Sequence, residues 1–123
     1  DVMKLQPENA LAINNVAWLM AEARKPGALE MALRADKLLV NRPVIMDTVA
    51  YAHSRAGQPG KAAEVLRQAL AIEPDNASLR LNLAKALADS GNKSAAKEQL
   101  KEVLKLGSSF ARIEEARELM RTL

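Results

Sequence analysis

The stretch VAYAHSRAGQPGKAAEVLRQAL, residues 49–70, is followed 34 residues later by LAKALADSGNKSAAKEQLKEVL, residues 83–104. Small, apolar and glycine residues stand at the same offsets in both: Val49-Ala50, Gly57, Ala62, Leu66 and Leu70 return as Leu83-Ala84, Gly91, Ala96, Leu100 and Leu104. Upstream, Pro7-Glu8-Asn9-Ala10 returns 67 residues later as Pro74-Asp75-Asn76-Ala77. A fixed period of this size indicates one supersecondary unit stacked on copies of itself. Neighbouring units then share a continuous core, because no unit buries its apolar face alone.

The composition favours helices. Hydrophobic residues make up 49% of the 123 residues and aromatic residues only 2%. The core must therefore be built from Ala, Leu, Val, Ile and Met, which suits close helix–helix packing better than a β-sandwich. This length gives one domain with a real core.

The charge pattern excludes several function classes. The net charge is +3, from 18 Lys and Arg against 15 Asp and Glu spread along the chain. This excess of positive charge is too small to indicate a nucleic-acid-binding surface, and no motif of aromatic and basic residues accompanies it. The absence of cysteine excludes disulfides and thiolate metal sites. No apolar run reaches about 18 residues, so we expect no direct membrane insertion by this segment.

Apolar residues at helical spacing, separated by proline and glycine, predict three helix pairs and a final helix. The expected helices are about 10–23 with 27–39, 44–56 with 61–72, 77–90 with 94–106, and then 110–122. The first would be capped by Asn9 and would bury Ile13, Val16, Ala17 and Met20. The predicted class is an all-α, right-handed α-solenoid of three units, 7–40, 41–74 and 75–108, with residues 109–123 as a C-terminal cap. Because the chain starts at Asp1, we interpret residues 1–6 as the tail of a truncated preceding helix.

These residues resemble the tetratricopeptide repeat, whose 34-residue unit has a small residue after a large one on its first helix, Gly in the turn and Pro at the end. Val49-Ala50, Gly57, Ala62, Ala69 and Pro74 fit that pattern in the second unit. The third unit departs from it at Ser108, and the first has a turn one residue short and Val40 in place of proline. The resemblance covers roughly residues 7–107 and implies a non-catalytic scaffold that binds a protein or peptide.

A resemblance to a narrower group of proteins rests on three short sequence motifs. Asn14-Asn15-Val-Ala-Trp18, Asp47-Thr48-Val-Ala-Tyr51 and Leu-Gly107-Ser-Ser-Phe110 with Glu115-Ala116 look like the C-terminal repeats of long bacterial tetratricopeptide lipoproteins. Those proteins are associated with exopolysaccharide production and PEP-CTERM protein sorting. The resemblance implies an extracytoplasmic, membrane-anchored full-length protein, with a cytoplasmic one as the alternative. The lipidated cysteine that such a protein needs is absent from this segment.

In a stacked array of this family the first helix of each pair lines a concave groove. The residues expected to project into it are Asn14, Asn15, Trp18 and Glu22, then Asp47, Thr48, Tyr51 and Arg55, and then Leu81, Asn82, Lys85 and Asp89. Trp18 and Tyr51, the sole Trp and Tyr, stand in the same register one unit apart. Such residues often form binding hot spots, although the alternative is that both only pack against adjacent helices. The Lys–Asn carboxylate clamp of some family members is not expected, because the paired lysines are missing.

Other candidate sites have plainer interpretations. The sole histidine, His53, has no cysteine or paired carboxylate at ligand spacing, so we expect a hydrogen-bonded core histidine and neither a metal nor a cofactor. Four lysines recur every four residues from Lys93 to Lys105 and could bind anionic lipid, but acidic neighbours favour solvated ion pairs. Phe110 would anchor the final helix over the third unit.

The rival function classes are an enzyme and a self-associating structural module. An enzyme is disfavoured because there is no phosphate-binding glycine loop, nucleophile elbow or metal cluster. Homo-oligomers could form through an exposed N-terminal end, where Val2, Met3 and Leu5 are apolar.

Overall fold

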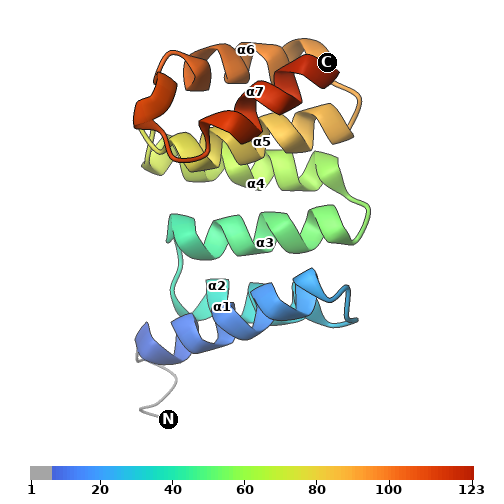
Figure 1. Cartoon of the computed structure of the whole chain (residues 1–123). Coiled ribbons are helices and arrows are strands. Elements are labelled where there is room, and N and C mark those ends of the chain that lie inside the picture. The colour runs from blue at the N-terminus through green and yellow to red at the C-terminus, as the bar shows by residue number, and fades with distance from the viewer. Residues whose placement is uncertain (1–6) are drawn as a thin grey trace.

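The computed structural model describes residues 7–123, which form an all-α array of helices packed in sequential pairs (Figure 1). The described helices are α1 (Pro7–Glu22), α2 (Ala28–Leu38), α3 (Pro43–Arg55), α4 (Pro59–Ile72), α5 (Ala77–Asp89), α6 (Lys93–Leu104), a 3-10 turn (Gly107–Ser109) and α7 (Ile113–Thr122). The predicted all-α class and the order of helix pairs are confirmed. No described helix is long and apolar enough to span a membrane.

Small side chains allow the helices to approach closely. Ala17, Ala32, Ala62, Ala84 and Ala96 are buried at 1% exposure or less. Each belongs to a core cluster shared by neighbouring helices, and larger residues such as Leu81 and Leu100 fill the core between α5, α6 and α7. The alanine-rich composition therefore has a packing role: the backbones come together where a bulkier side chain would hold them apart.

The turn inside each pair repeats the same hydrogen bond. The Gln58 N–H donates to the His53 carbonyl (2.9 Å), and the Asn92 N–H donates to the Leu87 carbonyl (2.8 Å). Between them Gly57 and Gly91 have φ values of 81° and 88°. Glycine adopts this left-handed conformation at no steric cost, and the bond satisfies a carbonyl at the helix end.

The first turn reaches the same geometry without glycine. The Lys25 N–H donates to the Met20 carbonyl at 2.8 Å, and Arg24 takes the left-handed conformation with a φ of 54°. Gly27, with a φ of 90°, then leads into α2. The link between α1 and α2, residues 23–27, is thus longer than the links 56–58 and 90–92, although the sequence spacing predicted a turn one residue short in the first unit.

Several predicted boundaries are wrong. The first helix begins at Pro7 rather than after a cap at Asn9, since proline fits the first turn of a helix. The last helix begins at Ile113 rather than Phe110, because Phe110 is extended (φ −99°, ψ 122°) and packs half-buried beside α6. Val16, predicted to face inward, is 45% exposed. The predicted helix tail at residues 1–6 lies outside the described residues, and the exact unit limits stay predictions.

The two remaining predicted features lie near their expected places. His53 is half-buried rather than fully enclosed, and its Nδ1 lies 3.1 Å from the Gln58 Oε1. On α6, Lys101 pairs with Glu98 and Lys105 pairs with Glu102 on the exposed face. Those lysines therefore form the predicted solvated ion pairs.

Candidate binding groove

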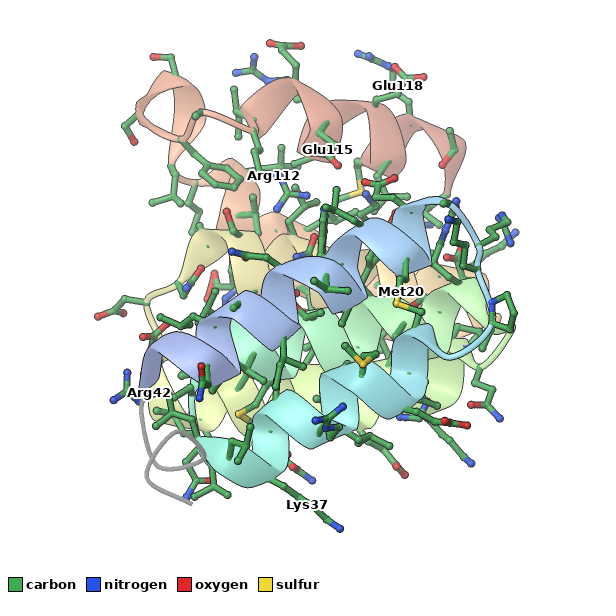
Figure 2. The ribbon with its side chains drawn as sticks, turned by 90° about the horizontal axis from the view of Figure 1, so that it is seen from below. Met20, Lys37, Arg42, Arg112, Glu115 and Glu118 are labelled. Carbon is green, nitrogen blue, oxygen red and sulfur yellow. The ribbon has the colours of Figure 1, made fainter. Side chains whose placement is uncertain are left out.

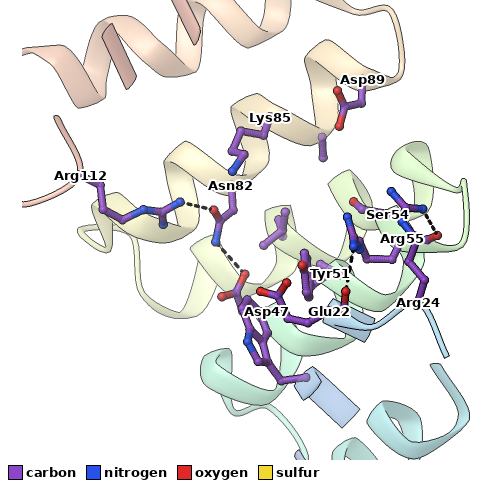
Figure 3. A pocket seen from close by; sticks show the side chains of 14 residues that line it. Glu22, Arg24, Asp47, Tyr51, Ser54, Arg55, Asn82, Lys85, Asp89 and Arg112 are labelled. Carbon is purple, nitrogen blue, oxygen red and sulfur yellow. Dashed lines mark hydrogen bonds between the residues drawn. The ribbon is translucent and has the colours of Figure 1, made fainter. Parts of the chain in front are cut away.

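The first helices of the three pairs, α1, α3 and α5, line a cavity of about 530 Å³ (Figure 3). Its wall mixes apolar and charged side chains: Trp18, Glu22, Arg24, Asp47, Ala50, Tyr51, Ser54, Arg55, Leu66, Asn82, Lys85, Ala86, Asp89 and Arg112. We call this cavity the groove. Its wall contains six of the nine residues that the sequence proposed for partner binding.

Trp18 from α1 and Tyr51 from α3 form an aromatic pair in the groove wall. The ring centroids are 4.2 Å apart and the planes are inclined by 26°, which is a stacked arrangement. Trp18 is 37% exposed and Tyr51 is half-buried against the alanines of α1 and α2. The pair therefore packs across two helices and still presents an apolar face to the groove.

Arg55 ties the same two helices together. Its Nε donates to the Ala21 carbonyl (3.1 Å) and an Nη donates to the Glu22 carbonyl (3.0 Å), at the C-terminal end of α1. The guanidinium carbon lies 5.7 Å from the centroid of the Tyr51 ring. A cation at this end of a helix interacts favourably with the helix dipole. Arg55 is therefore committed to the fold rather than free to recognise charge.

A polar network crosses the other end of the groove. The Asn82 Nδ2 donates to the Asp47 Oδ1 (3.0 Å), and an Nη of Arg112 donates to the Asn82 Oδ1 (2.9 Å). Arg112 also binds Glu115 through its Nε (2.8 Å), and Lys85 binds the same carboxylate (2.8 Å). The network links α3, α5 and the start of α7.

The orientation of α7 makes this network possible. In Figure 2, Arg112 and Glu115 point from α7 toward the other helices, while Glu118 points away from them. The buried residues Ile113 and Ala116 hold α7 against the core. One face of α7 thus covers the third pair, and its first turn adds charged side chains to the groove.

Burial and charge shift the acidity of three groups here. Burial raises the pKa of Asp47 above its usual value, against the opposing effects of the Asn82 amide, Arg112 and Lys85. The Arg112 hydrogen bond lowers the pKa of Glu115 to about 2, against partial desolvation and with help from Lys85. Burial also raises the pKa of Tyr51, together with the hydrogen bond to Glu22.

Four residues predicted to project into the groove do not line it, three because they are buried and one because it points elsewhere. Asn14 and Thr48 are only 5% and 3% exposed, and the Thr48 hydroxyl donates to the Val44 carbonyl at 3.3 Å. Leu81 is fully buried. Leu81 packs with Leu100 and Val103 of α6 and Ala116 of α7. Asn15 is exposed but does not line the groove.

Sequence reasoning missed Arg112 and Glu115. Extending the 34-residue period once more from α5 places Arg112 in register with Ser78 and Glu115 in register with Leu81. That signal marks the start of α7 as a further inner-wall segment. Among the described residues, no group of three or more His, Cys, Asp or Glu side chains could hold a metal ion.

The comparisons with known proteins agree with this architecture. A family model described as "Tetratricopeptide repeat" matches residues 54–119, which is 66 of the 123 residues. The chain is also 35% identical over 77 residues to the "TPR repeat-containing protein PA4667" of Pseudomonas aeruginosa, an alignment that covers 61% of this chain. It spans only 13% of the length of that relative.

Proposed function

Because the chain belongs to the tetratricopeptide repeat family, we propose that it is a non-catalytic scaffold that holds a peptide or a partner surface in its groove. Domains of this family are generally protein-interaction modules and are typically non-catalytic. The proposal places the partner between α1, α3 and α5, with the first turn of α7 bordering it.

The aromatic pair of Trp18 and Tyr51 is the observation that carries this proposal. Large aromatic side chains that remain partly exposed in a concave wall supply apolar contact area and a polar edge, and they dominate many binding interfaces. Trp18 stacks on Tyr51 of α3, and 37% of its surface nevertheless remains exposed. The alternative, that the pair only stiffens the array, predicts no loss of binding when it is truncated.

A peptide selection tests the proposal. Random 12-residue peptides displayed on phage would be selected against the immobilised chain and then measured on Trp18→Ala and Tyr51→Ala. We expect either substitution to weaken the selected peptides by at least about ten-fold, as expected for a hot spot worth more than about 1.4 kcal/mol. Ile72→Ala is the matched control, because it removes a similarly exposed apolar side chain from α4, outside the groove.

The melting behaviour of the same variants separates binding from packing. An aromatic pair contributes about 0.5–1.5 kcal/mol beyond the area that it buries. Losses of more than about 2 kcal/mol in both variants would be typical of core truncation. That result, with selected peptides still bound by the folded fraction, would assign Trp18 and Tyr51 to the fold alone.

A second candidate, self-association, is favoured by the outer side of α1. Leu11, Val16 and Leu19 are 40%, 45% and 66% exposed on the arc opposite the buried Ala17 and Ala21. A helix that is apolar on both sides usually has a partner on each. The residues first suspected of this role, Val2, Met3 and Leu5, lie outside the described residues.

Light scattering over a concentration series would test this second candidate. Wild type is expected to form dimers or larger species at high concentration, and Leu19→Glu is expected to remain monomeric because it places a charge in the exposed apolar arc. Arg34→Glu on the exposed side of α2 is a control for the change in charge. A wild-type chain that stays monomeric throughout would remove this candidate and leave the groove proposal standing.

The narrower resemblance to bacterial lipoprotein repeats extends the proposal to the cellular context of the scaffold. The scaffold would belong to an extracytoplasmic assembly for exopolysaccharide production or protein sorting. This part stays a prediction. The start of the full-length gene, read for a lipidation signal, and the genes beside it would test it.

A further inference from the structure

The charged residues of the groove divide into two kinds. Each first helix contributes one carboxylate to the wall: Glu22 from α1, Asp47 from α3 and Asp89 from α5. None of these three carboxylates forms an ion pair with any residue in 7–123. They are called the three carboxylates below.

The cations of the groove are mostly occupied within the molecule. Arg55 donates to two main-chain carbonyls of α1. Lys85 and Arg112 share the carboxylate of Glu115, at 2.8 Å each. Although cations outnumber carboxylates in the wall, they already donate to acceptors within the molecule, whereas none of the three carboxylates has a cation at ion-pair distance within residues 7–123; Arg112 and Lys85 act on Asp47 only from further away.

The aromatic pair lies one helical turn from two of these carboxylates. Asp47 precedes Tyr51 by one helical turn on α3, and Glu22 follows Trp18 by one turn on α1. In Figure 3 the Asp47, Glu22 and Tyr51 side chains all point into the groove. Aromatic faces attract ammonium and guanidinium groups, and the alkyl stem of a lysine or arginine packs well on them.

From these contacts we infer that the groove selects a positively charged partner: an extended protein segment whose lysine or arginine side chains pack over the aromatic pair and reach the three carboxylates. This inference rests on the proposed function and adds the chemistry of the partner to it. The burial that disfavours the charged form of Asp47 in the free protein would be offset by the incoming cation. Because such contacts are electrostatic, binding would weaken as the salt concentration rises.

Three peptide pools test the inference. All contain random 12-residue peptides with three invariant positions, which carry lysine in the first pool, glutamine in the second and glutamate in the third. Retention of each pool would be measured on immobilised wild type and on Trp18→Ala. We expect the lysine pool to be retained at least about five-fold better than the glutamine pool, in line with several partly exposed ion pairs, and the glutamate pool to be retained least.

Two substitutions connect that preference to the carboxylates. Asp89→Asn and Asp47→Asn are expected to lower retention of the lysine pool by about two- to five-fold each, and to leave the glutamine pool unchanged. Asp47→Asn keeps an amide oxygen that can accept from Asn82, so it is expected to fold at least as well as wild type. Asp75→Asn is the matched control, because Asp75 is exposed between α4 and α5 and does not line the groove.

The outcomes separate this inference from the function on which it rests. If the glutamine or glutamate pool is retained as well as the lysine pool, and retention is lost in Trp18→Ala, the groove binds peptides but the charge preference is wrong. An unchanged lysine pool in both aspartate variants would overturn the inference in the same way. If no pool shows retention that depends on Trp18, the proposed function fails and the inference fails with it.

Discussion

At the residue scale, Asn14 shows what a local pattern leaves undetermined. Its side chain is 5% exposed, and its Oδ1 has no hydrogen-bond partner among residues 7–123. The position 67 residues further on holds Leu81, which is fully buried in the equivalent place on α5. A buried carbonyl oxygen without a partner costs about 1–3 kcal/mol. Helix α1 thus carries a polar side chain at the position where α5 carries a hydrocarbon side chain.

Asn14→Leu is therefore expected to stabilise the chain. Removing the unsatisfied amide and restoring the side chain used at Leu81 would raise the free energy of unfolding by about 1–2 kcal/mol. Urea unfolding followed by circular dichroism measures the change. Asn15→Leu is the control, because Asn15 is exposed and no gain is expected there. A loss of stability in Asn14→Leu would show that the amide has a partner in solution.

The sequence predicted Trp18, Asp47, Tyr51, Arg55, Asn82 and Lys85 in the groove wall, and the structure places them there. It failed at Asn14, Asn15, Thr48 and Leu81, one helical turn or less away. Helical spacing tells which residues share a face, but the tilt of the neighbouring helix decides how much of that face it covers. Partner recognition by any of these residues stays a prediction.

At the scale of the element, the turns and caps account for where the helices begin and end. Asn76 accepts a hydrogen bond from the Leu79 N–H at 3.1 Å and therefore caps α5. The recurring motif that ends in Asn-Ala suggests such a cap from the sequence. The similar motif Pro7-Glu8-Asn9-Ala10 is used differently, because Pro7 already lies within α1. A similar local sequence therefore does not fix where the helix boundary falls.

Asn76→Ala is expected to lower the free energy of unfolding by about 1 kcal/mol, the usual cost of a lost N-cap. Asn92→Ala at the start of α6 should cost less, since its bond to the Ala95 N–H is longer, at 3.4 Å, and exposed. Thermal unfolding of the two variants side by side gives the comparison. Equal losses would contradict the assignment of Asn76 as the stronger cap.

The left-handed turn glycine gives a second expectation at this scale. Gly57→Ala should cost about 1–2 kcal/mol, because a Cβ is strained at a φ of 81° even though no atom lies within 4 Å of it. Gly60→Ala is the control: it lies within α4, also has open space around it, and should gain about 0.5–1 kcal/mol. The difference in urea midpoint between the two variants measures the stability cost of placing a Cβ at the left-handed residue of the turn. If both variants gain stability, residue 57 does not adopt the left-handed conformation.

At the scale of the whole molecule, the repeat predicts the stacking of pairs but not the way in which the array ends. The expected cap helix was placed from 110, whereas residues 107–112 form a 3-10 turn, the extended residue Phe110 and a second turn, which link α6 to α7. That link depends on where the half-buried Phe110 finds space against the third pair, which is a tertiary contact without a local signal. The same link sets Arg112 beside Asn82 and joins α7 to the groove.

The ion pairs of Glu115 make the attachment of α7 sensitive to acid. Its pKa falls from 4.5 to about 2 in the folded chain, so its stabilising contribution is present above about pH 4.5 and is lost as the pH falls toward 2. Asp47 acts in the opposite direction, because its raised pKa means that the folded state binds the proton more readily. Urea midpoints measured between pH 6 and pH 2.5 should fall more for wild type than for Glu115→Gln. Glu118→Gln, which alters an exposed pair within α7, should follow wild type, and parallel curves for wild type and Glu115→Gln would contradict this role.

The central claim is that the inner wall of α1, α3 and α5 is the binding face. Amide and side-chain NMR spectra of the ¹⁵N-labelled chain, titrated with the tightest peptide from the phage selection, test it most directly. The account predicts shifts at the Trp18 indole N–H, the Asn82 side-chain amide and the backbone around Tyr51, with α2, α6 and the residues of α4 outside the groove wall unaffected. Shifts confined to those second helices, or to the exposed arc of α1 at Leu11 and Leu19, would contradict it.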